Sequence, residues 1–142
     1  YEALAEKKMK VMFHVGGEPL PSPSNRSRPD MIARIADDFP ELDIIGAHLG
    51  GLNMWDDVYE LIAGKKNIYL ECSLIYSYIK PTVAEKIVRR HGPEKVFFGS
   101  DYPFSSIKAS LASARAAHFL TSEEKEGLLG RNAFNFFLKD HR

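Results

Sequence analysis

The segment KVFFGSDYPF at residues 95–104 decides the fold, because it joins a buried strand to a polar turn. The apolar run at 96–98 is typical of a short strand that is covered on both faces. Gly99 interrupts the run, and Asp101 follows just ahead of a proline. A lone aspartate in this position usually only shapes a turn. Its meaning therefore depends on whether other strands end in the same way.

Similar apolar runs recur earlier in the chain, and each is followed by a helical pattern of residues. The helical patterns are punctuated by prolines near their starts or glycines at their ends. This strand–helix alternation predicts an α/β domain over residues 1–142, with a parallel sheet and right-handed crossovers. The expected strands span residues 10–15, 42–48, 67–72 and 95–99, and the expected helices span 28–39, 52–64, 81–92, 108–120 and 121–138.

Composition excludes several classes of protein. The chain has 142 residues, of which 44% are apolar and 27% charged, as expected for one domain with a packed core. The 19 basic and 19 acidic residues balance, which argues against general binding to nucleic acid or to an anionic membrane. No apolar run approaches the roughly 20 residues that span a bilayer. The single cysteine, Cys72, excludes an internal disulfide, so we expect a cytoplasmic protein.

Polar side chains follow three of the four expected strands. His14 ends the first, His48 ends the second, and Asp101 follows the fourth. The carboxyl ends of parallel strands are where α/β enzymes place their active sites. One such histidine is more often a structural residue than a ligand, but three polar residues at matching positions favour a shared site. Imidazole and carboxylate groups are the usual ligands of a hydrolytic metal ion.

Side-chain alternation along each strand predicts which residues share a face. It places His48 on the face of Ile44 and Gly46, and Asp101 on the face of Gly99. The two glycines would then leave room beside these functional side chains.

Alternation also separates Glu71 and Ser73 from Cys72 on the third strand. If Cys72 packs against helices, Glu71 points to the inner side of the sheet. Elsewhere, His91 stands at the end of a helical pattern, where the helix dipole favours a cation. The irregular stretch at 16–28 is rich in glycine, proline and serine. We expect its part at 18–28 to help select the substrate, with Arg26 or Arg28 facing a carboxylate.

Taken together, four motifs carry a resemblance to a known family. They are HVGG at 14–17, HLGG at 48–51, GSDYP at 99–103 and LTSEEKEGLLGRNAFNFF at 120–137. Their order and spacing resemble the C-terminal half of amidohydrolase-related proteins. That branch includes metal-dependent hydrolases, lactone hydrolases and the aminocarboxymuconate semialdehyde decarboxylase group. The resemblance implies a (β/α)8 TIM barrel, of which this chain supplies about the last four β/α units.

The resemblance also implies roles for the three strand-end residues. His14 would be a metal ligand, and His48 would serve in acid–base or substrate-orienting work. Asp101 would ligate the metal or handle the proton of its bound water. The expected cofactor is a divalent ion, Zn²⁺ ahead of Mn²⁺, and the expected partner is a small-molecule substrate. The leading hypothesis is hydrolysis of a carbonyl-type substrate; non-oxidative decarboxylation is the alternative, which these residues do not separate.

The chain departs from the family pattern in one large respect. The family brings a His-x-His pair to the metal, and no His-x-His occurs here. A full barrel takes about 250 residues, so we expect this sequence, which begins at Tyr1, to be part of a longer protein. By itself it should hold a metal ion weakly.

Four β/α units alone would leave two open strand edges and an uncovered inner face bearing Met12 and Phe97. We therefore expect a homo-oligomer, or association with a missing N-terminal half. A different hypothesis makes the chain a catalytically incomplete half-barrel that acts only in assembly. A third, phosphate binding at Gly50-Gly51 ahead of a helix, is disfavoured because the chain has neither a P-loop nor a G-x-G-x-x-G motif.

Overall fold

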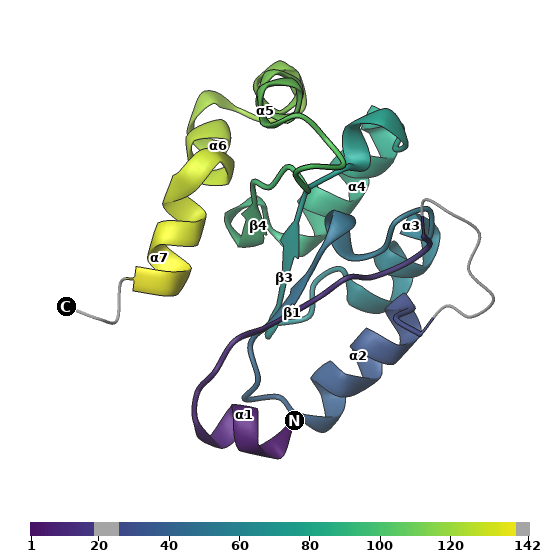
Figure 1. Cartoon of the computed structure of the whole chain (residues 1–142), viewed down its shortest axis with the longest axis vertical. Coiled ribbons are helices and arrows are strands. Elements are labelled where there is room, and N and C mark those ends of the chain that lie inside the picture. Colours follow the sequence, from purple (N-terminus) through teal and green to yellow (C-terminus); the bar gives the residue numbers. More distant parts are fainter. Residues whose placement is uncertain (19–25, 139–142) are drawn as a thin grey trace.

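The computed structural model describes residues 1–18 and 26–138 and contains a four-stranded sheet (Figure 1). All neighbouring strands are parallel and lie side by side in chain order. This arrangement confirms the predicted α/β class. The strands are shorter at both ends than the sequence predicts. Their bounds are β1 (Val11–Phe13), β2 (Ile44–Gly46), β3 (Ile68–Glu71) and β4 (Val96–Phe97).

Helices connect and follow the strands as the sequence predicts. The spacing of Thr121 and Glu124 in the sequence predicts a capping box. One is present at the start of α6, where the Thr121 backbone N–H donates to Glu124 and the Glu124 N–H donates to Thr121 Oγ1. None of the helices in the described part of the chain is both long and apolar enough to cross a bilayer. The helices are α1 (Glu2–Glu6), α2 (Pro29–Asp38), α3 (Trp55–Asp57) with a π-helical turn at Val58–Ile62, α4 (Pro81–His91), α5 (Ile107–Ala116), α6 (Ser122–Glu126) with a π-helical turn at Gly127–Arg131, and α7 (Asn132–Leu138).

One face of the sheet carries the hydrophobic core. Ile44, Ile68 and Leu70 are fully buried there, beneath α2, α4 and the π-helical turn that follows α3. Cys72 belongs to the same core, as expected of a small apolar residue. Since successive strand residues point to opposite faces, Glu71 lies on the other face, as alternation predicted.

The opposite face is partly covered. Met12 is 55% exposed, which agrees with an open inner face. The same expectation is wrong for Phe97, which is only 4% exposed. The reason is α7, whose Phe136 ring lies 5.2 Å from the Phe97 ring and 4.0 Å from that of Tyr69. The C-terminal helix therefore covers the aromatic side chains on β3 and β4 and leaves β1 uncovered.

Candidate active site

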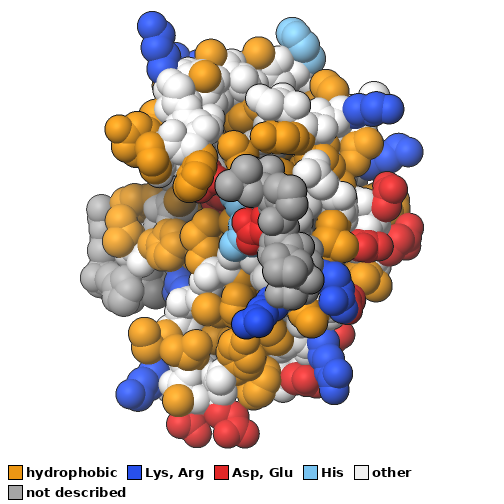
Figure 2. All heavy atoms as spheres, turned by 45° about the vertical axis from the view of Figure 1, so that its right-hand side comes forward, with side chains coloured by type: hydrophobic (Ala, Val, Ile, Leu, Met, Phe, Trp, Pro, Cys, Tyr) orange, Lys and Arg blue, Asp and Glu red, His pale blue; other side chains and the backbone are white. Residues whose placement is uncertain are grey.

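A cavity of about 610 Å³ opens at the carboxyl ends of the strands. Histidine and acidic side chains meet at the centre of the face shown in Figure 2, among hydrophobic side chains. All three predicted strand-end residues line this cavity, so the fold brings them together. The polar side chains that line it are His14, Glu18, His48, Glu71, Ser73, Ser100 and Asp101.

His14 and His48 are in direct contact. The His14 Nδ1 atom lies 2.9 Å from His48 Nε2, and the two rings meet edge to face. The predicted face of His48 was nevertheless wrong, because Ile44 and Gly46 point into the core. The chain leaves β2 after Gly46, and His48 has a left-handed φ of 58°. That turn re-aims the His48 side chain into the cavity, away from the face that strict alternation assigned to it.

Hydrogen bonds from His48 determine where its ring proton lies. His48 Nδ1 is 3.2 Å from the Ser73 carbonyl oxygen, which can only accept. Nδ1 therefore carries a hydrogen. Burial lowers the pKa of His48 below its ordinary value, so the ring is neutral at pH 7 and Nε2 is an acceptor. His14 Nδ1–H then donates to it, which leaves His14 Nε2 facing Glu18 Oε1 at 3.4 Å.

Glu71 is a buried acid at the floor of the cavity. It is 7% exposed, and its Oε2 accepts a 2.7 Å hydrogen bond from the Ser73 hydroxyl. Burial raises its pKa to about 7. Gly99 makes the space, because a Cβ built there would lie 1.6 Å from Glu71 Oε1. The room beside Gly99 is thus filled by Glu71. The alternation of side chains along the third strand predicted that Glu71 points inward, on the side opposite Cys72. Neither Glu71 nor Ser73, however, was among the predicted site residues.

Asp101 follows β4 in a strained turn. Its φ is 59°, and its carbonyl oxygen accepts a hydrogen bond from the Ser105 N–H at 3.2 Å. Asp101 therefore does shape a turn, as an aspartate ahead of a proline usually does. The side chain is half-buried and lines the same cavity as His14 and His48. Asp101 therefore combines a turn with a position at the candidate site.

The residues present fit a divalent metal ion only in part. His14 and Asp101 have the right donor chemistry, and both line the cavity. Within residues 1–18 and 26–138, however, no group of three or more His, Cys, Asp or Glu side chains is arranged to hold an ion. Metal sites in proteins usually have three or four protein ligands. The described part of the chain thus supplies two candidate ligands of an incomplete set.

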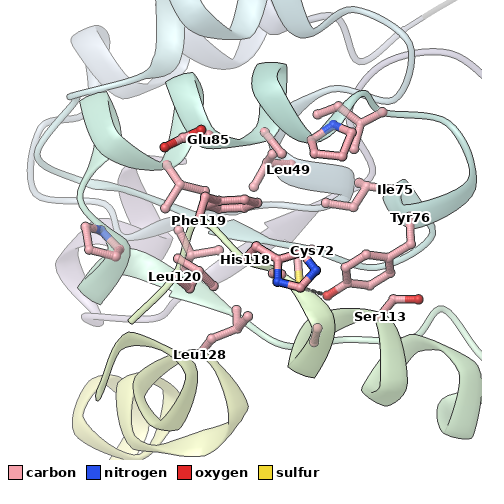
Figure 3. A pocket seen from close by; sticks show the side chains of 18 of the residues that line it. Leu49, Cys72, Ile75, Tyr76, Glu85, Ser113, His118, Phe119, Leu120 and Leu128 are labelled. Carbon is pink, nitrogen blue, oxygen red and sulfur yellow. Dashed lines mark hydrogen bonds between the residues drawn. The ribbon is translucent and has the colours of Figure 1, made fainter. Parts of the chain in front are cut away.

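A second cavity, of about 620 Å³, lies on the helix-covered side of the sheet (Figure 3). Its lining is mostly apolar, with Leu49, Ile75 and Leu128 among the side chains drawn. Tyr76 Oη lies 3.1 Å from Cys72 Sγ there, and burial raises the pKa of the Cys72 thiol to about 12. A thiol of this kind is inert near neutral pH, so Cys72 is not a candidate nucleophile in this cavity.

The glycine pair at Gly50-Gly51 serves packing. A Cβ on Gly50 would lie 2.9 Å from Leu70, and one on Gly51 would lie 2.8 Å from Val58. The pair therefore lets the turn approach the core closely, which explains these glycines without a phosphate.

The structure bears on two expectations about charged residues. His91 is 5% exposed, and burial lowers its pKa to about 4, so the expected cation at the end of α4 is wrong. Desolvation outweighs the helix dipole there. Arg28 is already paired with Asp30 through two 2.9 Å hydrogen bonds. Most of the predicted substrate loop, residues 19–25, lies outside the described residues.

Comparison with known proteins identifies the family. Residues 1–138 match the amidohydrolase family model, and the chain belongs to this family. A search of curated proteins gives no match. Solved structures with low sequence identity share the fold, and they are TIM-barrel enzymes of which this chain covers about half. The predicted barrel family is confirmed on this basis.

Three of these structures show the range of the resemblance. A 2,6-dihydroxybenzoate decarboxylase from Rhizobium has a TM-score of 0.71 at 15% identity, over 98% of this chain and 54% of that one. A dihydroxybenzoic acid decarboxylase from Polaromonas with bound manganese has a TM-score of 0.67 at 17% identity, over 99% of this chain and 53% of that one. An amidohydrolase from Burkholderia multivorans with bound zinc has a TM-score of 0.61 at 13% identity, over 73% of this chain and 46% of that one.

Proposed function

We propose that this chain forms half of the active site of a metal-dependent enzyme of the amidohydrolase family, acting on a small carbonyl or carboxylate substrate. The observation that carries the proposal is the convergence of His14, His48 and Asp101 in one cavity at the strand ends. Decarboxylation is at least as well supported as hydrolysis, since two of the similar structures are decarboxylases. The chain spans about half the length of these structures, so the complete reaction belongs to the assembled barrel.

In this proposal His14 and Asp101 would supply part of the ligand set of a divalent ion, Mn²⁺ or Zn²⁺. The ion would supply Lewis acidity and orient the substrate. His14 is suited to the task because its Nδ1–H is committed to His48 and its Nε2 remains towards the cavity. His48 holds His14 in that orientation. Its own position is held in turn by Ser73, at 3.2 Å from both the carbonyl and the hydroxyl oxygen.

Asp101 would move the proton in either reaction. In hydrolysis its carboxylate would accept a proton from the attacking water. In decarboxylation it would carry a proton taken from water and would deliver it to the carbon whose bond to the carboxylate breaks as carbon dioxide leaves. The same geometry serves both reactions because a half-buried carboxylate at the cavity wall can be a base or, once protonated, an acid.

The test supplies the assembled barrel, which is this chain together with the remaining β/α units, with Mn²⁺ or Zn²⁺ and with either 2,6-dihydroxybenzoate or an aryl lactone. Carbon dioxide release from the first substrate supports decarboxylation, and acid release from the second supports hydrolysis. Either activity should fall at least about 100-fold in Asp101→Asn, since general acid–base catalysis contributes 10²–10⁴-fold. Activity that survives both Asp101→Asn and His14→Ala would exclude this site.

One observation favours a second candidate function, assembly without catalysis. Within the described residues β1 and β4 each pair with only one strand, and Met12 is exposed on the inner face. An exposed apolar face beside open strand edges favours association with another polypeptide. A second copy of the chain, or the remaining units of the barrel, would complete the sheet. Loss of both activities in a chain that still associates would favour this function.

A further inference from the structure

A continuous line of polar contacts runs from the floor of the cavity to His14. Glu71 Oε2 lies 2.7 Å from Ser73 Oγ, which lies 3.2 Å from His48 Nδ1. The other ring nitrogen of His48 lies 2.9 Å from His14 Nδ1. Four side chains from the ends of β1, β2 and β3 are therefore joined in one line, and only the last of them is exposed.

The chemistry of these groups sets the direction of every donor in the line. A serine hydroxyl has one hydrogen, and Ser73 gives it to Glu71. The Ser73 oxygen can then only accept from His48 Nδ1–H, as its carbonyl oxygen also does. His48 Nε2 is left as an acceptor for His14 Nδ1–H. Without an acceptor at Glu71, the Ser73 hydrogen would be free to turn towards His48 Nδ1, and only the Ser73 carbonyl would still favour the Nδ1–H tautomer.

The burial of Glu71 indicates that this line is built rather than incidental. Burying a carboxyl group costs free energy that an apolar side chain would avoid. Here the cavity floor holds one at 7% exposure, and its Oε1 has no hydrogen-bond partner among the described residues. Gly99 keeps the space for this oxygen, since any larger residue would collide with it.

We propose that Glu71 and Ser73 are positioning residues that hold His48 as its Nδ1–H tautomer, so that His14 presents Nε2 to the cavity. Among the described residues Glu71 has no hydrogen bond to either imidazole ring, and it acts through Ser73. The benefit to catalysis rests on the proposed function, whereas the tautomer is a property of the folded chain alone. The two ideas can therefore fail separately.

The tautomer can be measured by long-range ¹H–¹⁵N correlation on the full chain with ¹⁵N-labelled histidine, without metal or substrate. His48 should show a protonated Nδ1 and an unprotonated Nε2. Glu71→Leu should shift the ratio of the two tautomers about fivefold or more towards Nε2–H, which is what the loss of one ordinary hydrogen bond gives. Glu71→Gln keeps an acceptor oxygen and should retain the wild-type ratio.

Gly99→Ala provides a second perturbation that leaves the carboxyl group in the protein. Its new Cβ would displace the end of the Glu71 side chain and should shift the tautomer in the same direction as Glu71→Leu. The matched control is Glu41→Leu, the same change at an exposed glutamate, which should leave His48 unchanged. An Nε2–H tautomer in the wild-type chain would overturn the proposal. So would an unchanged ratio in Gly99→Ala, or in Glu71→Leu if that variant folds.

Discussion

Replacing Glu71 by glutamine should change how the stability of the protein depends on pH. Glu71 is buried, and desolvation raises its pKa from an ordinary 4.5 to about 7. Between these values the folded protein binds a proton more tightly than the unfolded chain does. Stability is therefore fully present below pH 4.5 and is lost as the pH rises through 7. Glutamine cannot ionise, so Glu71→Gln escapes this loss.

The expected size follows from the two pKa values. A tenfold change in an acid constant is worth about 1.4 kcal/mol. Between pH 5 and pH 8 the wild-type protein should lose about 2.5 kcal/mol of unfolding free energy through Glu71. Relative to wild type, Glu71→Gln should become more stable by that amount over the same range. Any constant offset from replacing the carboxyl group by an amide does not affect this change.

His91 should give the opposite result. Its pKa is lowered from 6.5 to about 4 by burial, so its contribution to stability is present above pH 6.5 and is lost as the pH falls towards 4. Between pH 5 and pH 8 the wild-type protein gains about 2 kcal/mol through this group. In wild type the two effects nearly cancel. His91→Gln should therefore become less stable relative to wild type as the pH rises.

Urea unfolding followed by circular dichroism at pH 5, 6, 7 and 8 measures both differences. Glu41→Gln, which removes an exposed carboxylate, sets the background. A difference between Glu71→Gln and wild type that changes by less than about 1 kcal/mol across this range would refute the reasoning, because it would mean that Glu71 ionises freely in the fold.

Three further outcomes are expected. In calorimetry the chain should bind Mn²⁺ or Zn²⁺ only weakly, because His14 and Asp101 are two ligands of an incomplete set; tight one-to-one binding that His14→Ala abolishes would show that they suffice. In light scattering across a dilution series the chain should associate, and Met12→Glu on the open face should weaken the association; a stable wild-type monomer at micromolar concentration would contradict this. Asn132→Ala should lower the free energy of unfolding by about 2 kcal/mol in chemical denaturation. The reason is that Asn132 Nδ2 donates hydrogen bonds to the carbonyls of Pro93 and Val96 at 2.9 Å and so joins the C-terminal helices to β4. A loss below about 0.5 kcal/mol would mean that these hydrogen bonds are not needed.

The sequence by itself determined the order of the elements and the side of the sheet that carries the chemistry. Short apolar runs alternating with helical patterns predict parallel strands, and parallel strands bring their carboxyl ends to one edge. For this reason His14, His48 and Asp101 could be assigned to one cavity from their strand-end positions alone. Local rules also predicted the capping box at Thr121, because its partners lie three residues apart.

Only the tertiary structure decided what surrounds each of these groups. The direction in which the His48 side chain points depends on a left-handed turn after β2, and the alternation of side chains along a strand does not predict such a turn. Whether Phe97 meets water depends on α7, which begins 35 residues later in the chain, at Asn132. The neutral state of His91 and the raised pKa of Glu71 depend on how much packed protein excludes water from them. Desolvation is a sum over neighbours distant in sequence, so burial and charge state emerge only when the chain is folded.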